Sequence, residues 1–239
     1  MRIMIIGGTS GIGLALAEHY AQTGAQVAVC GRNPGRNPGQ RFSAEYPLDI
    51  ADRNALAAAV QAFGADGLDL LIVTAGQYAD ADSLADYPAL GLALVQTNIV
   101  GLCHAFEVAG AHMCAQGHGQ IVAVASIAGL LPDYPGASLY SASKRAAIAI
   151  CASYRAALAP YGIAVTTIVP GYVDTARLRE LNGGSAAGKP FLQSEAAAVR
   201  RMVAAIDQRV PMCVFPWQLH ALVRVFHWLP RWLQRRRGR

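Results

Sequence analysis

Tyr140 and Lys144 are the residues whose type and spacing most directly suggest chemistry. They stand four residues apart, a separation that places two side chains on the same face of a helix, one turn apart. A fixed ammonium there would favour the phenolate and lower a phenol pKa that is about 10 in isolation. Only two of the twenty basic side chains are lysines, Lys144 and Lys189. The pair is either a proton-transfer device or an ordinary contact on a solvated helix, and the residues around it favour the first.

The elements that must position this pair follow from an alternation of short β-branched runs with longer Ala- and Leu-rich segments. Strands are predicted near residues 2–6, 26–30, 69–73, 119–125, 162–168 and 211–214, with a further short strand before Asp49. Helices are predicted near residues 12–23, 52–63, 89–115, 138–159 and 194–207. Continuous apolar strands separated by helices predict a Rossmann-like fold, a doubly wound parallel sheet in three α/β/α layers within a single domain. Such sheets bind ligands beyond the carboxyl ends of their strands.

Composition limits the class of protein. With 239 residues, 54% hydrophobic and 15% charged, the chain can bury one large core. Its five cysteines are odd in number, lack a C-x-x-C spacing and favour a cytoplasmic location, and the apolar run at residues 1–6 is too short for a secretory signal. The last sixteen residues hold six arginines and no acid, so subtracting their +6 from the formal charge of +5 leaves about −1 for residues 1–223. No nucleic-acid partner is expected, and the histidines and cysteines at 103–118 match no metal spacing.

A glycine-rich turn follows the first predicted strand and precedes a helix. It reads Gly7-Gly8-Thr9-Ser10-Gly11-Ile12-Gly13. Glycines there allow a tight turn and let backbone N–H groups at a helix N-terminus approach a pyrophosphate. The turn lacks the full G-x-G-x-x-G form, because Leu16 stands where the last glycine would be. The context of strand and helix still predicts a dinucleotide site.

The residues after the second strand indicate which dinucleotide binds. An NAD site would place an acid there for the ribose 2′-hydroxyl, whereas an NADP site would place an arginine. The chain has Gly31 at the acid's position and Arg32 beside it, with Arg36 as a candidate second phosphate contact. NADP(H) is therefore the expected cofactor, the alternative being that Arg32 is a solvated loop residue.

From the glycine turn onward the chain resembles the short-chain dehydrogenase/reductase family, up to about residue 214. The spacing T-G-x-x-x-G-x-G carries the resemblance, although Ile6 replaces the usual threonine. Asp49-Ile50 resembles the adenine-contacting pair, and Thr74-Ala75-Gly76 belongs to a motif in which the family has two asparagines before Ala-Gly. With Arg32 included, the expected cofactor contacts are Gly7, Thr9, Ser10, Gly11, Ile12, Gly13, Arg32, Asp49, Ile50, Ala75, Gly76, Asn98, Tyr140, Lys144, Pro170, Gly171, Val173 and Thr175.

The resemblance extends to the residues expected to perform the reaction. Ser126 with Gly129 matches the family's S-x-x-G motif, and Tyr140 with Lys144 matches its Y-x-x-x-K motif. It implies that Tyr140 is the general acid/base, that Ser126 polarises the reacting oxygen, and that Lys144 lowers the pKa of Tyr140 and holds the nicotinamide ribose. Asn98 is implied to support a water relay. Ser126 and Tyr140 are fourteen residues apart, one more than expected, so the turn-rich segment between them must absorb the extra residue.

The sequence says less about the residues that would contact the substrate. Residues 176–193 contain the turn sequences Asn182-Gly183-Gly184 and Gly188-Lys189-Pro190 and are expected to form a mobile lid or an ordinary loop. If the fold is as predicted, Leu130, Leu131, Tyr134 and Tyr172 would line an apolar pocket, which favours a hydrophobic carbonyl or alcohol.

Residues 215–239 form a C-terminal segment beyond the resemblance. It contains all three tryptophans, Trp217, Trp228 and Trp232, among apolar side chains and arginines. This composition is typical of a helix that lies on an anionic membrane surface, although the apolar run is too short to span a bilayer. The alternative is that the aromatic part packs on the body of the protein or on a partner subunit.

The sequence thus predicts an NADP(H)-dependent oxidoreductase domain over residues 1–214 and an amphipathic tail over residues 215–239. The expected reaction interconverts a carbonyl and a secondary alcohol on an apolar small molecule by Ser-Tyr-Lys catalysis. Two alternatives stay open: a lipid or acyl-chain reductase at a membrane surface, and a nucleotide-sensing or scaffold protein with little turnover. The resemblance also implies a homodimer or homotetramer built on the helices at 89–115 and 138–159.

Overall fold

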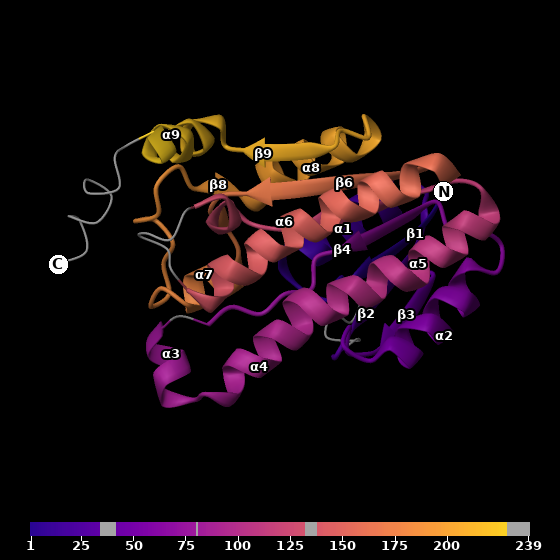
Figure 1. Cartoon of the computed structure of the whole chain (residues 1–239), viewed down its shortest axis with the longest axis horizontal. Helices are drawn as coiled ribbons and strands as arrows, with labels where there is room; N and C mark the ends of the chain where they lie inside the picture. Colours follow the sequence, from indigo (N-terminus) through magenta and orange to yellow (C-terminus); the bar gives the residue numbers. More distant parts are fainter. Residues whose placement is uncertain (34–41, 80, 132–137, 229–239) are drawn as a thin grey trace.

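The computed structural model describes residues 1–33, 42–79, 81–131 and 138–228 (Figure 1). Within these residues the centre is a seven-stranded parallel sheet in the order β3-β2-β1-β4-β5-β6-β9. Its strands are β1 (Arg2–Ile6), β2 (Gln26–Gly31), β3 (Ala44–Pro47), β4 (Leu70–Val73), β5 (Gly119–Val124), β6 (Ile163–Pro170) and β9 (Met212–Phe215). The predicted doubly wound parallel sheet is confirmed.

Helices cover both faces of this sheet (Figure 1). One face carries α1 (Gly11–Gln22) and α8 (Glu195–Asp207), and the other carries α2 (Arg53–Gly64), α5 (Leu102–Gln116) and α6 (Leu139–Leu158). The shorter helices are α3 (Ala81–Asp86), α4 (Ala89–Val95) and α7 (Ala176–Glu180), and α9 (Trp217–Trp228) follows the last strand. A π-helix, Gln96–Gly101, joins α4 to α5, so the single helix predicted at 89–115 has an irregular turn in its middle.

Two apolar cores lie on opposite sides of the sheet. Met4 and Ile6 of β1 are buried in the core under α2, α5 and α6, whereas Ile3 and Ile5 are buried in the core under α1 and α8. Successive side chains of a strand point to opposite faces, so a strand covered on both sides must be apolar at every position. This requirement explains the unbroken apolar runs of β1 and β4.

The order of the strands determines where a ligand can bind. The chain winds outward from β1 through β2 to β3, then returns to β4 on the other side of β1 and continues to β9. A crevice opens at such a reversal, beyond the carboxyl ends of the strands. Gly7, Thr74 and Ser126 all follow strands at this edge.

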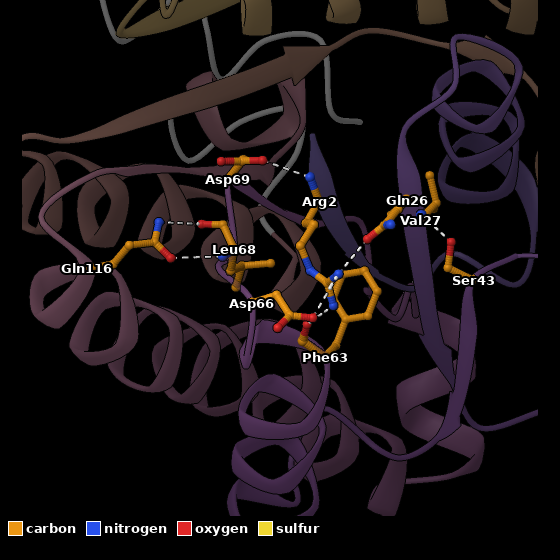
Figure 2. A network of polar contacts seen from close by, with 9 residues as sticks. All are labelled: Arg2, Gln26, Val27, Ser43, Phe63, Asp66, Leu68, Asp69 and Gln116. Atoms are coloured by element: carbon orange, nitrogen blue, oxygen red, sulfur yellow. Dashed lines mark hydrogen bonds and ion pairs between the residues drawn. The ribbon is translucent and has the colours of Figure 1, made fainter.

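At the amino ends of the strands, opposite this crevice, polar contacts around Arg2 join several elements (Figure 2). The Arg2 N–H donates to Asp69 at 2.7 Å, and its guanidinium donates to the Phe63 carbonyl at 2.5 Å and lies 4.7 Å from the centroid of the Phe63 ring. The Gln116 side chain accepts from the Leu68 N–H at 2.8 Å and donates to the Leu68 carbonyl at 3.1 Å. These contacts join β1 to the ends of α2 and α5, far from the crevice.

The helical segment Ala89–Gln116 is long and apolar enough to cross a membrane, by length and composition only. In the fold, its α5 portion buries Phe106, Ala109 and Met113 in the core beneath α2 and α6. A core helix of this kind passes the same test, so the segment carries no argument for a membrane span.

Candidate active site

The glycine turn after β1 presents open backbone at the start of α1. Gly7 and Gly11 have φ angles of 88° and 48°, a region that residues with a Cβ rarely adopt. A Cβ on Gly13 would lie 2.2 Å from the Gly7 carbonyl oxygen, whereas no described atom lies within 4 Å of a Cβ built on Gly11. Ser10, the N-cap, makes no hydrogen bond to α1 through its side chain in the described chain. The first N–H groups of α1, including that of Ile12, thus border a cradle that fits a pyrophosphate.

Thr74, at the end of β4, holds this turn in place through hydrogen bonds. Its Oγ1 donates to the Ile6 carbonyl at 3.0 Å, and the N–H groups of Thr74 and Ala75 donate to the same oxygen at 2.8 and 3.0 Å. The same Oγ1 would lie 2.7 Å from a Cβ on Gly7 and 2.4 Å from one on Gly13. A threonine in place of the expected asparagine therefore still connects β4 to the turn, and it requires glycine at both positions.

Gly31, at the end of β2, leaves no space for the acid of an NAD site. A Cβ on Gly31 would lie 2.5 Å from Oγ1 of Thr9, so the Thr9 side chain occupies that position. Arg32 follows directly and is exposed. The cradle is consistent with a ribose phosphate at this end, and Arg36 lies outside the described residues.

Asp49 and Ile50 precede α2. The Asp49 carboxylate accepts a hydrogen bond from the Ala51 N–H at 2.9 Å, which fixes it within its own turn. Ile50 is buried, and its Cγ2 would lie 2.6 Å from a Cβ on Gly101. Ile50 thus packs against the π-helix, and the contact of this pair with adenine stays a prediction.

Ser126 and Tyr140 meet where β5 ends and α6 begins. Ser126 is the N-cap of the 3₁₀ helix Ile127–Leu130, and its Oγ accepts from the Ala128 N–H at 3.2 Å. Burial raises the pKa of Tyr140, and a hydrogen bond with the Ser126 side chain offsets part of that rise. The longer segment between the two residues does not separate them, although its residues 132–137 are outside the described part of the chain.

Lys144 is enclosed one helical turn beyond Tyr140. Its Nζ donates to the Val124 carbonyl at 3.1 Å and lies 5.8 Å from the centroid of the Tyr140 ring. Burial lowers the pKa of Lys144 to about 8. The expected lowering of the Tyr140 pKa does not appear: the pKa is raised, because removal of water from the phenol outweighs the hydrogen bond that favours the phenolate.

Asn98 lies in the π-helix and links three elements. Its Oδ1 accepts from the Gln77 N–H at 2.7 Å, and its Nδ2 donates to the Gln77 carbonyl at 2.9 Å and to Ser143 Oγ at 3.0 Å. Ser143 Oγ in turn donates to the Tyr140 carbonyl at 2.8 Å. Asn98 therefore fixes the first turn of α6 relative to the residues after β4, and its part in a water relay stays a prediction. Ser143 was missed from sequence, although its position one turn after Tyr140 indicated this contact.

Two further tyrosines lie beside Tyr140. The Tyr78 ring packs edge-on against it, with centroids 4.9 Å apart and an interplanar angle of 67°. Tyr78 and Tyr172 both interact electrostatically with Tyr140 and raise its pKa further. Tyr172 was predicted as a pocket residue, whereas Tyr78 was missed. Its place two residues after Gly76, at the carboxyl end of β4, was the available signal.

The Pro170-Gly171 motif continues from β6 into a second, two-stranded sheet, β7 (Val173–Asp174) and β8 (Gln193–Ser194). Val173 is buried and pairs with Gln193. Thr175 caps α7, because its Oγ1 accepts from the Leu178 N–H at 3.2 Å. Its hydroxyl hydrogen can still be donated to a ligand, and contact with the nicotinamide stays a prediction.

Helix α9 packs against apolar residues beside the site. Its buried residues Leu219 and Val223 form a cluster with Ile127 of the 3₁₀ helix, and Leu130, Leu131, Tyr172 and Val214 pack against them. A Cβ on Gly171 would lie 2.7 Å from Cδ2 of Leu219, so this contact requires the glycine. One face of the C-terminal segment thus packs on the body, and predicted residues Tyr134 and Trp232 lie outside the described chain.

Comparison with known proteins finds relatives among oxidoreductases. The short chain dehydrogenase family matches residues 1–186. An uncharacterized oxidoreductase of Staphylococcus epidermidis is 31% identical over 72% of this chain and 77% of that protein. An uncharacterized oxidoreductase of Mycobacterium tuberculosis is 29% identical over 98% of this chain and 96% of that protein.

Solved structures resemble the fold over nearly the whole chain. A gluconate 5-dehydrogenase from Burkholderia cenocepacia, in complex with NADP and tartrate, is 26% identical with a TM-score of 0.76, covering 92% of this chain and 95% of that chain. A short chain dehydrogenase from the same species, in complex with NADP, has a TM-score of 0.81 at 23% identity, covering 100% and 97%, a likeness of fold. With the family match over residues 1–186, these findings show that the chain belongs to the short-chain dehydrogenase/reductase family of oxidoreductases.

Proposed function

We propose that the protein is an NADP(H)-dependent enzyme that interconverts a carbonyl and a secondary alcohol, with Ser126, Tyr140 and Lys144 as catalytic residues. The observation that carries the proposal is the proximity of three side chains. Ser126 is close enough to Tyr140 to offset part of the rise in its pKa, and Lys144 Nζ lies 5.8 Å from the centroid of the Tyr140 ring. Two hydroxyl groups that meet at a strand end can both donate to one substrate oxygen. An ordinary surface pair of Tyr and Lys would not require a serine at that point.

Tyr140 and Ser126 have distinct tasks in reduction. Bound NADPH supplies a hydride to the carbonyl carbon. The Tyr140 hydroxyl transfers its proton to the oxygen as negative charge develops there, and Ser126 stabilises that charge as a neutral donor. The raised pKa of Tyr140 keeps this proton in place at neutral pH. In alcohol oxidation Tyr140 acts as phenolate and accepts the hydroxyl proton.

The cradle residues support NADP(H) as the cofactor. The open start of α1 at Gly11 would hold the pyrophosphate, and Arg32 beside the occupied Gly31 position would hold the ribose 2′-phosphate. Lys144 would hold the nicotinamide ribose. The two Burkholderia structures described above contain NADP, which agrees with this choice.

A panel of aldehydes, ketones and secondary alcohols, assayed by NADPH absorbance, tests the proposal. We expect turnover of at least one carbonyl with NADPH, and a kcat/KM with NADH lower by tenfold or more, since the site has no acid for the 2′-hydroxyl. A preference for NADH would contradict the cofactor assignment. Absence of turnover across the panel, with nucleotide still bound, would favour a sensing or scaffold role.

A second candidate function is reduction of a lipid or acyl chain at a membrane surface, and the outer face of α9 favours it. On this face Trp217, Leu222 and Val225 are 69%, 57% and 61% exposed, and Arg224 is exposed beside them. Apolar and aromatic side chains next to a cation are typical of a helix that lies on anionic lipid. Six arginines in the last sixteen residues add charge of the same sign.

Vesicle co-sedimentation separates this candidate from the first. We expect the protein to bind phosphatidylglycerol vesicles more tightly than phosphatidylcholine vesicles if α9 docks on lipid. The double variant Leu222→Asp/Val225→Asp would then lose binding, whereas Tyr161→Asp, at an exposed site far along the chain, would retain it. Equal sedimentation of wild type and double variant would reject a lipid role for α9.

A further inference from the structure

We propose that Lys189 binds an anionic group of the substrate. The preferred carbonyl or alcohol substrate then carries a carboxylate or a phosphate ester group. This inference rests on the proposed function, because it names the substrate class of the same site. It differs from the expectation of a purely apolar pocket, since it adds one cation to that pocket.

Lys189 is connected to the reaction centre through Tyr172. Its Nζ lies 5.5 Å from the centroid of the Tyr172 ring. Tyr172 is close enough to Tyr140 to interact with it electrostatically. A ring face attracts an ammonium but satisfies none of its three N–H donors, so a cation held this way can still bind an anion.

The segment that carries Lys189 is fixed to the protein on both sides. The Lys189 N–H donates to the carbonyl of Ala186 at 3.0 Å, and Ala186 is 2% exposed. Further along, the Gln193 N–H donates to the Tyr172 carbonyl at 2.9 Å, where β8 pairs with β7. Lys189 is itself half-buried, so its ammonium has a defined place beside the Tyr172 ring.

The two acids between Tyr172 and Lys189 in the sequence pair with arginines. Asp174 pairs with Arg179 at 2.7 Å, and Glu180 pairs with Arg177 at 2.8 Å. In the part of the chain that the structure describes, Lys189 makes no ion pair of its own. A lone positive charge at the edge of a binding site selects ligands by sign, because it attracts anions and repels cations.

The apolar wall supplies the rest of the recognition. Leu130 and Leu131 pack with Tyr172 against Leu219 of α9. A substrate whose carbonyl lies at Tyr140 can place its hydrocarbon part along this wall and its anionic end at Lys189. Oxo acids and hydroxy acids have this arrangement of groups.

Matched substrates test the inference kinetically. Oxo acids of graded chain length, including levulinate, would be compared with their methyl esters and with the corresponding oxo phosphonates. We expect wild type to prefer the anions, and Lys189→Gln to reduce kcat/KM for them about tenfold or more through KM, with esters unchanged. Lys189→Arg should retain most of the preference, and Arg200→Gln, which removes an exposed charge on α8, should leave all values unchanged. The series with the higher kcat/KM, carboxylate or phosphonate, identifies the anionic group.

Amine labelling gives a readout that does not depend on turnover. Lys144 is 7% exposed, so Lys189 is the lysine side chain open to an acetylating reagent, and mass spectrometry of its peptide reports the extent of reaction. We expect levulinate or the phosphonate to protect Lys189, and methyl levulinate to give no protection. Turnover of esters and acids with equal kcat/KM, without protection of Lys189, would overturn the inference while leaving the proposed function intact. Protection without any turnover would support the anion site and reject the proposed function.

Discussion

At the scale of single residues, Lys144 shows how a proposed catalytic residue can oppose stability. Its ammonium is buried with one hydrogen bond, to the Val124 carbonyl. Burial lowers its pKa from the ordinary 10.5 to about 8, because the enclosed charge has lost water. The difference corresponds to roughly 3 kcal/mol that the folded state loses by keeping the charge at neutral pH.

Replacing Lys144 by Met should therefore separate activity from stability. We expect Lys144→Met to lower kcat/KM for carbonyl reduction about a hundredfold or more, since the charge beside Tyr140 is lost. The free energy of unfolding at pH 7 should be unchanged or higher, by up to roughly 3 kcal/mol. Urea denaturation together with NADPH consumption measures both quantities.

The pH dependence of stability provides a control for this assignment. Because the folded pKa is below the unfolded one, the unfolded chain binds more protons between pH 8 and 10.5, and unfolding becomes harder as pH rises through that window. This contribution should be present in wild type and absent from Lys144→Met. If the free energy of unfolding has the same pH dependence in the two proteins, burial does not lower the pKa of Lys144.

Arg32 is proposed to determine the cofactor preference. We expect Arg32→Ala to weaken NADPH binding about tenfold or more and to leave NADH binding nearly unchanged, because only the 2′-phosphate loses a partner. Tryptophan fluorescence titrations of both nucleotides measure the two dissociation constants. Arg200→Ala, on α8, is the matched control, and an equal loss of NADH affinity in Arg32→Ala would contradict the assignment.

Sequence was informative about which side chains gather at the site, but less about their environment. Motif spacing predicted Ser126, Tyr140 and Lys144, and the structure brings all three together. The direction of the Tyr140 pKa shift was wrong, because burial depends on neighbours such as Tyr78 that come from other strand ends. The filling of the Gly31 position by Thr9 also depends on two segments that are distant in sequence.

At the scale of elements, α9 packs the C-terminal segment against the apolar cluster that includes Tyr172. Leu219 is 7% exposed and contacts the Gly171 position, so the helix supports the motif expected to meet the nicotinamide. The sequence left open whether this segment packs on the body or on lipid. The structure shows that one face packs on the body, since Leu219 and Val223 are buried, whereas Trp217 on the other face is exposed. Binding of that outer face to lipid stays a proposal. Amphipathic composition alone could not show which residues face inward.

Truncation of Leu219 should damage the pocket as well as stability. We expect Leu219→Ala to lower the free energy of unfolding by roughly 2–3 kcal/mol through the cavity that it leaves. KM for the carbonyl substrate should rise, because Tyr172 loses support, while nucleotide affinity should change less, because the glycine turn and Arg32 are far from Leu219 in the sequence and are unaltered. Chemical denaturation and steady-state kinetics check this, with Leu222→Ala on the outer face as the control. Equal effects of the two variants would contradict the inward orientation of α9.

At the scale of the whole molecule, the apolar strand runs were sufficient to predict the parallel sheet and its two helical layers. The periodic pattern could not reveal the π-helix at Gln96–Gly101, the small β7–β8 sheet or the short helices α3 and α7. Those elements are too short or too irregular for periodicity, and contacts with the rest of the fold determine them. They also border the crevice, where local patterns are least regular.

Assembly is the remaining prediction at this scale. We expect a homodimer or homotetramer in which α4–α5 and α6 pack against partner copies, as the resemblance implies. The outer face of α6 carries exposed small residues, among them Ala149, that permit close packing. Ala149→Arg should lower the mass measured by sedimentation velocity without unfolding the protein, and a wild type that is monomeric at all concentrations would contradict this prediction.

The central claim is that Tyr140 donates the proton in an NADP(H)-dependent reduction. The most direct test compares NADPH consumption by wild type, Tyr140→Phe and Tyr161→Phe on a carbonyl that wild type reduces, with nucleotide affinity measured in parallel. Tyr161 is 57% exposed and provides the matched loss of a phenol hydroxyl. We expect kcat to fall about a hundredfold or more only in Tyr140→Phe, with NADPH affinity retained. Unchanged turnover in Tyr140→Phe would contradict the claim.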